Sequence, residues 1–134
     1  MEITWLGTAG FDISTKDSRF LIDPYVSRNP EAEPVQPKRP ADLAGAERIF
    51  ISHGHFDHLM DLPEILAQDP ERPARVFCSA TAAKTLEKKG VSPSRIYRVT
   101  RDNTAVRFGH VAARACFGRH IRFDLSLVAA TLAR

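Results

Sequence analysis

The sequence is poor in cysteine, in long apolar runs and in secretion signals. Two cysteines in 134 residues, Cys78 and Cys116, are too few for a disulfide scaffold and favour two buried thiols in a reducing compartment. The apolar stretch 125–132 is interrupted by Ser126 and Thr131, and it is far shorter than the roughly 20 residues that cross a bilayer. No basic segment opens the chain as it would in a signal peptide. We therefore expect a cytoplasmic protein with no membrane span.

Neither sign of charge dominates. Lys and Arg total 19 against 16 acidic residues, which gives a formal net charge of +3. The basic residues are scattered along the sequence and no run of them alternates with aromatics, so a small-molecule substrate is favoured over nucleic acid. A hydrophobic content of 43% in 134 residues is enough for one core. We expect a single domain over residues 1–134.

Periodicity predicts an α/β fold, with a mixed sheet that carries helices on one face. The strands are expected at 2–6, 11–14, 19–22, 48–52, 75–78, 96–99, 105–108 and 111–115. Helices are expected after residue 58, at 80–89 behind a Ser79 cap, and at 124–132. The first three strands have short connections and must be antiparallel neighbours. Segment 25–42, with four prolines, is expected to be a surface loop at one edge of a substrate mouth.

Three histidines and an aspartate fall within six residues that follow the strand expected at 48–52. They are His53, His55, Asp57 and His58. Imidazole and carboxylate groups bind zinc, manganese or iron. In an extended segment, positions 53, 55 and 57 would point one way, and Gly54 would let the backbone bend between the first two histidines. The sequence therefore predicts a metal centre at the carboxyl end of a strand, where α/β sheets place functional groups.

The six residues His53-Gly54-His55-Phe56-Asp57-His58 resemble the HxHxDH signature of the metallo-β-lactamase superfamily. Thr4-Trp5-Leu6-Gly7 and Leu21-Ile22-Asp23-Pro24 resemble the first strands of its metal-dependent hydrolase branch, which includes lactonase-like enzymes. The resemblance implies half of an αββα sandwich. It also implies a hydrolase that activates water at its metal to cleave an ester, lactone, amide or phosphodiester.

The resemblance further implies roles for the clustered residues. His53 and His55 would hold a first ion, Asp57 and His58 a second, and Asp57 would also orient the attacking water as a catalytic residue. The family needs another histidine on the first ion, for which His120 is favoured because it follows the last expected strand.

Two further assignments remain open at this point. His110, the other candidate for the additional histidine, sits in an expected exposed hairpin turn. Asp23 either orients one of the histidines or simply ends a strand.

The chain departs from the family after His120. Asp124 follows it, but no further histidine does, so the second ion would lack two of the ligands that the family supplies. We therefore expect the chain to bind one or two ions. Enzymatic activity of this chain is therefore left open. The alternative is a catalytically incomplete metal-binding half-domain, in which a second copy covers the exposed apolar face of the sheet. A nuclease of the same superfamily is disfavoured because no basic stripe or stacking platform is evident in the sequence.

Overall fold

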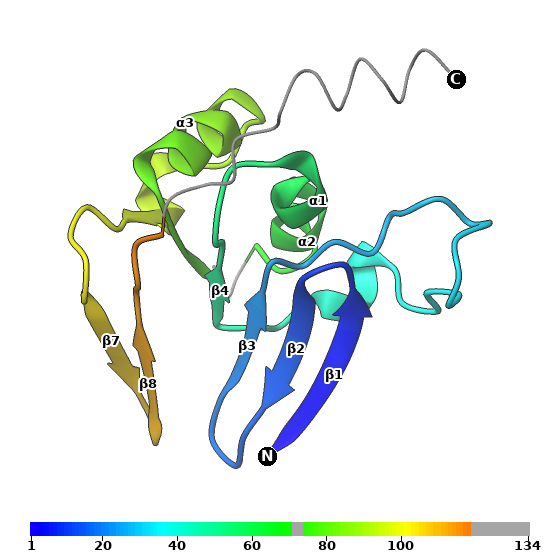
Figure 1. Ribbon diagram of the computed structural model, residues 1–134, viewed down its shortest axis with the longest axis horizontal. Coiled ribbons are helices and arrows are strands. Elements are labelled where there is room, and N and C mark those ends of the chain that lie inside the picture. Colours follow the sequence, from blue (N-terminus) through cyan, green and yellow to red (C-terminus); the bar gives the residue numbers. More distant parts are fainter. Residues whose placement is uncertain (71–73, 119–134) are drawn as a thin grey trace.

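Six strands form one mixed sheet in the order β1-β2-β3-β4-β5-β6 (Figure 1). The computed structural model describes residues 1–70 and 74–118, so the helix expected at 124–132 lies outside the described residues. The strands are β1 Glu2–Gly7, β2 Gly10–Ser14, β3 Arg19–Ile22, β4 Arg48–Phe50, β5 Arg75–Cys78 and β6 Ile96–Arg98. The pairs β1–β2 and β2–β3 are antiparallel, and the pairs from β3 to β6 are parallel. Each expected strand is confirmed to within two residues.

Helices cover one face of this sheet, as expected. They are α1 Phe56–Leu59, α2 Leu62–Ala67 and α3 Ala80–Lys88, with 3-10 turns η1 at Pro40–Leu43 and η2 at Pro93–Arg95. The Ser79 hydroxyl accepts a hydrogen bond from the Ala82 amide at 3.2 Å and caps α3, because the first amides of a helix have no partner inside it. None of the helices in the described ranges is long and apolar enough to cross a membrane.

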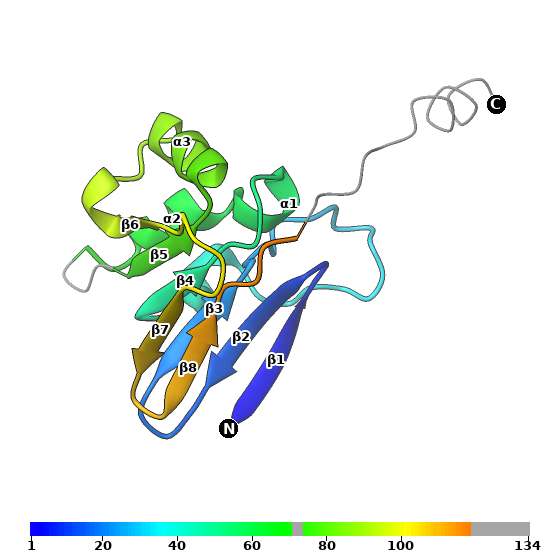
Figure 2. The same ribbon diagram turned by 60° about the vertical axis from the view of Figure 1, so that its left-hand side comes forward.

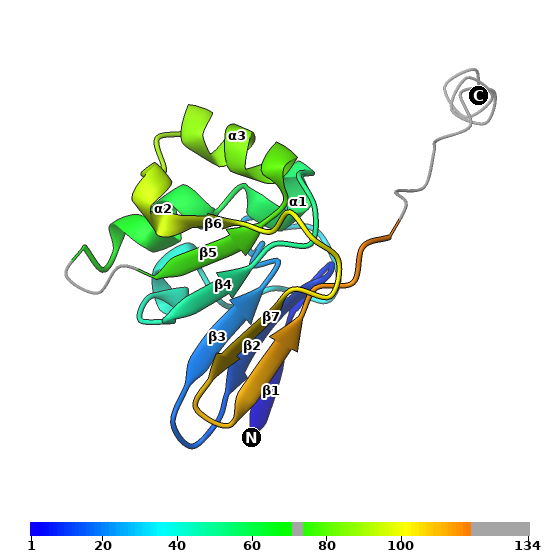
Figure 3. The ribbon, with the colours of Figure 1, turned by 90° about the vertical axis from the view of Figure 1, so that its left-hand side faces the viewer.

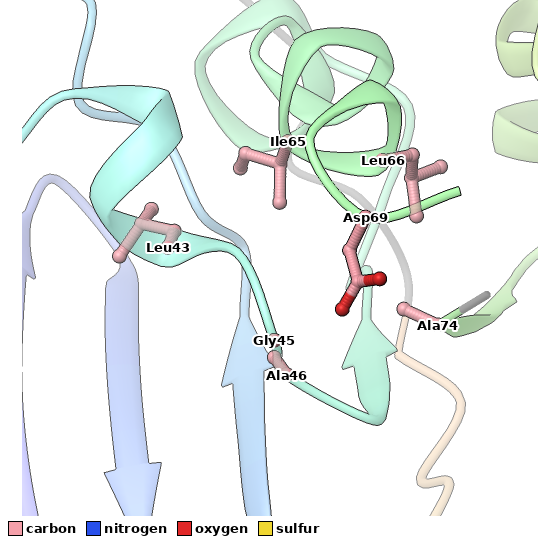
Figure 4. A pocket seen from close by; sticks show the side chains of 7 residues that line it. All are labelled: Leu43, Gly45, Ala46, Ile65, Leu66, Asp69 and Ala74. Carbon is pink, nitrogen blue, oxygen red and sulfur yellow. The ribbon is translucent and has the colours of Figure 1, made fainter. Parts of the chain in front are cut away.

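The core lies between the helices and the face of the sheet that they cover. Leu21, Ile49 and Val76 are register neighbours on β3, β4 and β5, and all three are fully buried. Leu62 of α2 and Leu86 of α3 pack in the same cluster. A small cavity of about 10 Å³ lies between η1 and α2 (Figure 4), with room for about one water molecule.

Aromatic side chains line the opposite face of the sheet, and a separate hairpin packs against it. The hairpin joins β7 Ala105–Phe108 to β8 Val111–Arg114, and Figure 2 shows it alongside β2 and β3. Its Phe108 ring lies 5.3 Å from Phe20 and 6.0 Å from Phe50, centroid to centroid. On the same face, Ile3 and Trp5 of the edge strand β1 remain more than half exposed, at 54% and 52%. The expected exposed apolar face is therefore covered in part only.

The proline-rich segment before β4 is a loop, as expected, but it is fastened to the sheet. Arg19 and Lys38 both contact the buried Asp12 carboxylate, at 2.9 and 3.0 Å. Burial alone would raise the pKa of Asp12, but the hydrogen bonds from the two cations outweigh it and hold that pKa below its usual value. The Arg19 guanidinium also donates to the Ala44 carbonyl at 2.7 Å. The end of the loop is thus clamped to β2 and β3.

The expectation of two buried thiols is wrong for one cysteine. Cys78 ends β5 inside the core, whereas Cys116 is exposed just beyond β8. The hairpin packs on the sheet through one face only, and residues 116–118, which follow it, are exposed. Burial raises the pKa of the Cys78 thiol to about 11, so this thiol stays protonated at neutral pH.

A thiol titration at pH 8 should therefore label the two cysteines very unequally. We expect a chromogenic disulfide reagent to react rapidly with one thiol per chain, Cys116, and with the second only after unfolding. Cys116→Ser should abolish the rapid phase, and Cys78→Ser should leave it intact. Equal rates for both thiols in the folded chain would contradict the burial of Cys78.

Candidate metal centre

The four clustered residues lie where the chain leaves β4 and enters α1 (Figure 1). His55 is extended, with φ −77° and ψ 155°, and it occupies the N-cap position of α1. Asp57 and His58 are therefore helical, and the expected alternation of positions 53, 55 and 57 along an extended segment is wrong. An acidic residue in the first helical turn suits the positive end of the helix dipole. The chain does bend at His53 and Gly54, as expected, but the bend does not require glycine, because the φ of Gly54 is not positive and an added Cβ would meet Ala82 only at an ordinary 3.6 Å.

His58 is the most firmly held member of the cluster. It is 8% exposed, and its Nδ1 lies 2.9 Å from Asp23 Oδ2. The Asp23 carboxylate also accepts hydrogen bonds from the Ser52 amide at 2.7 Å and the Ser52 hydroxyl at 2.6 Å. A carboxylate at Nδ1 favours the tautomer with its proton there, which leaves Nε2 as the coordinating atom. Asp23 thus does more than end β3: it orients a histidine, one of the two roles open from the sequence.

The backbone of Asp23 is itself unusual. Its φ of +42° lies in the left-handed region, where aspartate is among the few residues other than glycine found with any frequency. Its amide donates to the Phe50 carbonyl at 2.9 Å, which ties the end of β3 to the end of β4. Strained backbone of this kind tends to occur at functional sites. Here it directs the carboxylate toward Ser52 and His58.

The remaining histidines contact one another and His58. His53 Nε2 lies 3.1 Å from His55 Nδ1, and the Ser52 hydroxyl lies 3.0 Å from His53 Nδ1. The ring centroids of His53 and His58 are 3.9 Å apart, and Asp57 Oδ2 lies 3.7 Å from His58 Nε2. The structure therefore brings His53, His55, Asp57 and His58 together in one contiguous cluster.

Of the two candidates for an additional histidine, His110 and His120, the structure describes only His110. His110 is 88% exposed in the turn between β7 and β8, where its Nε2 lies 3.8 Å from Asp17 Oδ2. Figure 3 shows that turn at the opposite end of the molecule from α1, so His110 does not belong to the cluster. His120 lies outside the described residues.

The donor set suits a metal ion, since it combines three imidazoles with one carboxylate. Within residues 1–70 and 74–118, however, no three His, Cys, Asp or Glu side chains form a ready group for a metal as they stand. His53 Nε2 and His55 Nδ1 lie 3.1 Å apart, close to the spacing of two imidazole nitrogens on one tetrahedral zinc ion.

Ser52 and Asp61 support the site but were not picked out in the sequence as functional residues. Asp61 is 4% exposed, and its Oδ2 accepts hydrogen bonds from the Val26 amide at 2.7 Å and the Ser27 amide at 2.8 Å. A carboxylate among the apolar positions that open α2 was the available signal for Asp61. For Ser52, the only signal in the sequence was its position between the strand and the first histidine.

The family follows from a comparison with known domains. A model of the beta-lactamase superfamily domain matches residues 18–126, most of the chain. The chain belongs to the beta-lactamase superfamily. A metal-dependent hydrolase of Rhizobium etli is 36% identical over 115 residues, which are 84% of this chain and 45% of that protein.

Solved structures agree on the fold of this superfamily member. A metallo hydrolase from the archaeon Ignicoccus hospitalis superposes with a TM-score of 0.59 at 19% identity, over 78% of this chain and 41% of its own. An isothiocyanate hydrolase from Delia radicum gut bacteria gives a TM-score of 0.51 at 21% identity, over 81% and 43%. The chain thus spans less than half the length of each of these three proteins.

Proposed function

We propose that this protein contributes the metal-binding core of a hydrolase. The observation that carries the proposal is the cluster of His53, His55, Asp57 and His58, with His58 oriented by the Asp23 carboxylate at 2.9 Å. Histidines that bind metals usually donate their other ring N–H to a carboxylate, a backbone carbonyl or water, which orients them. The names of the relatives, a metal-dependent hydrolase and a metallo hydrolase, point to the same chemistry.

The residues divide between two ions on this proposal. His53 and His55, with His120, would hold the first; Asp57 and His58 would hold the second. The metal, zinc or else manganese or iron, would lower the pKa of a bound water and polarise the scissile bond when present.

The chain's own side chains would prepare the reaction. Asp57 is 31% exposed, so its carboxylate can accept a hydrogen bond from a water molecule and orient it for attack. The Asp23 carboxylate holds the Nδ1 proton of His58 and prevents the ring from turning over. The substrate would be a small ester, lactone, amide or phosphodiester in the cytoplasm, where the two thiols stay reduced.

Nucleic acid is a weaker candidate, although the structure gathers basic and aromatic side chains that are scattered in the sequence. Arg48, Arg75 and Arg107 line a groove of about 470 Å³ together with Phe77 and Tyr97. Arg48 and Arg75 are the first residues of β4 and β5, whereas the histidine cluster follows the last residue of β4. A strand bound in this groove would lie at the wrong end of the sheet for cleavage by the cluster.

Elemental analysis of the purified protein tests the proposal first. We expect one or two zinc, manganese or iron ions per chain, and slow turnover of p-nitrophenyl acetate or bis-p-nitrophenyl phosphate that stops after dialysis against chelator and returns with zinc. Two ions per chain would mean that further ligands come from a partner. A chain that binds no metal at micromolar concentration would refute the proposal.

A second candidate is a catalytically incomplete half-domain that pairs with another copy through its aromatic face. Two observations favour it. Ile3 and Trp5 of the edge strand β1 are exposed on the same face as the Phe20–Phe50–Phe77 row, and exposed apolar side chains of this kind occur at interfaces. The groove on this face carries Glu47 as well as arginines, so a two-fold pairing can bring opposite charges together.

Light scattering distinguishes this candidate. We expect a mass of twice the 14.9 kDa chain, with concentration-dependent dissociation. Trp5 is the single tryptophan of the sequence, so its emission should shift to the blue on association because the indole leaves water. Trp5→Glu should give a monomer and Trp5→Phe should preserve the dimer. A wild-type chain that remains monomeric at high concentration would rule out the pairing.

A further inference from the structure

Apolar side chains stand beside the histidine cluster. Phe56 lies between His55 and Asp57 in the chain and is 63% exposed. Its ring meets the Tyr25 ring edge to face, with centroids 5.9 Å apart and an interplanar angle of 87°. Met60, one helical turn after Phe56, is 46% exposed. Positions i and i+4 of a helix lie on the same face, so Phe56 and Met60 present one apolar surface that Tyr25 extends.

The loop that carries Tyr25 is fixed on both sides by buried carboxylates. Before it, Asp23 is 3% exposed and is tied to Ser52, through that residue's amide and its hydroxyl. After it, Asp61 binds the amides of Val26 and Ser27 at 2.7 and 2.8 Å. Asp61 thus holds the backbone of residues 26 and 27 directly, and Asp23 ties the start of the loop to Ser52 while it also orients His58. The Tyr25 ring is thus held against Phe56 in advance of any ligand, which lowers the entropy cost of binding there.

We propose that Tyr25, Phe56 and Met60 form an apolar wall that binds the hydrocarbon or aryl part of a small ligand whose polar head sits at the histidine cluster. This inference rests on the proposed function and specifies its substrate class: an amphipathic acyl compound. Single exposed apolar residues are common on protein surfaces. Here two are joined by a direct ring contact, Met60 lies one turn further along from Phe56 with the Lys89 ammonium 3.4 Å from its sulfur, and the histidine motif itself supplies Phe56.

Hydroxamates can test the wall and the metal site independently, because their head group binds zinc and their tail can be varied. Titration calorimetry of the zinc-loaded chain would compare acetohydroxamate with benzohydroxamate. We expect benzohydroxamate to bind about tenfold more tightly, as partial burial of a phenyl ring predicts. Phe56→Ala and Tyr25→Ala should remove that preference without changing the affinity for acetohydroxamate. Tyr25→Phe, which keeps the ring, should retain it, and so should Tyr97→Ala, which removes a partly exposed ring from β6 on the face of the sheet opposite the helices.

The second measurement follows the nitrogen-15 amide chemical shifts of residues 25, 56 and 60. Benzohydroxamate is titrated into the zinc-loaded chain and, separately, into the metal-free chain. Shifts centred on these amides would support the wall in either form. Equal affinities for the two hydroxamates in the wild type would overturn the wall while leaving the metal site intact. If acetohydroxamate does not bind, the proposed metal site is wrong. The titration of the metal-free chain then tests the wall alone, and the absence of shifts at residues 25, 56 and 60 would overturn the wall as well.

Discussion

His55→Ala is expected to lower zinc affinity at least a hundredfold while the chain remains folded. The mutation removes one of the three imidazoles assigned to the first ion, and His55 is exposed, so little packing is lost with it. Competition with a chromophoric chelator would give the affinity, and far-ultraviolet circular dichroism would report the fold. Unchanged metal content in the variant would show that the ion binds elsewhere.

Three further variants make that measurement specific. His110→Ala removes an exposed histidine at the opposite end of the molecule and should leave zinc affinity unchanged, whereas His120→Ala should lower it. Asp23→Asn keeps a side chain that tolerates the left-handed backbone and still accepts from Ser52, but its amide group can no longer accept the Nδ1 proton of His58. We expect about a 10- to 100-fold loss of affinity, the usual effect of losing such a supporting group.

Asp61→Ala is expected to destabilise the protein by about 3 kcal/mol, because it leaves the Val26 and Ser27 amides without a charged acceptor. In a domain of this size that corresponds to a fall of about 10 °C in Tm. Thermal unfolding followed by circular dichroism would measure it. A shift below about 2 °C would mean that water replaces the carboxylate and that the loop is not anchored there.

Neighbouring variants provide the controls for that measurement. Glu64→Ala removes an exposed carboxylate from the first turn of the same helix and should change stability by no more than about 0.5 kcal/mol. Asp61→Asn retains one carbonyl oxygen as an acceptor and should lose roughly half as much as Asp61→Ala. The order of the three variants therefore isolates the buried charge.

Local patterns predicted most of the fold. The β3 strand at Arg19–Ile22 and the Ser79 cap of α3 are as expected, because strand alternation and capping depend on residues a few positions apart. The start of α1 at Phe56 was not predicted. An exposed aromatic and two polar residues give no helical period, and α1 has only four residues, so tertiary contacts decide its conformation.

The clustering of the candidate ligands could be predicted from the sequence, whereas of their supports only Asp23 was named, as one of two alternatives. The clustered histidines are neighbours in sequence, so their proximity needed no tertiary information. The bond from Asp61 to Val26 joins positions 35 apart, and the bonds from Asp23 to Ser52 join positions 29 apart. Such contacts depend on parallel pairing of β3 and β4, whose long connection carries no local signal of register.

The change from antiparallel to parallel pairing at β3 has a kinetic consequence. The β1–β2–β3 meander closes short loops, whereas β3 can meet β4 only after residues 23–47 have been looped out, and such non-local pairing forms late in folding. The support for His58 comes from Asp23 after β3, and the histidines follow β4, so the complete site exists only once this late pairing is made. A bound ion would then stabilise the native state more than the folding transition state. It should slow unfolding and leave the folding rate nearly unchanged.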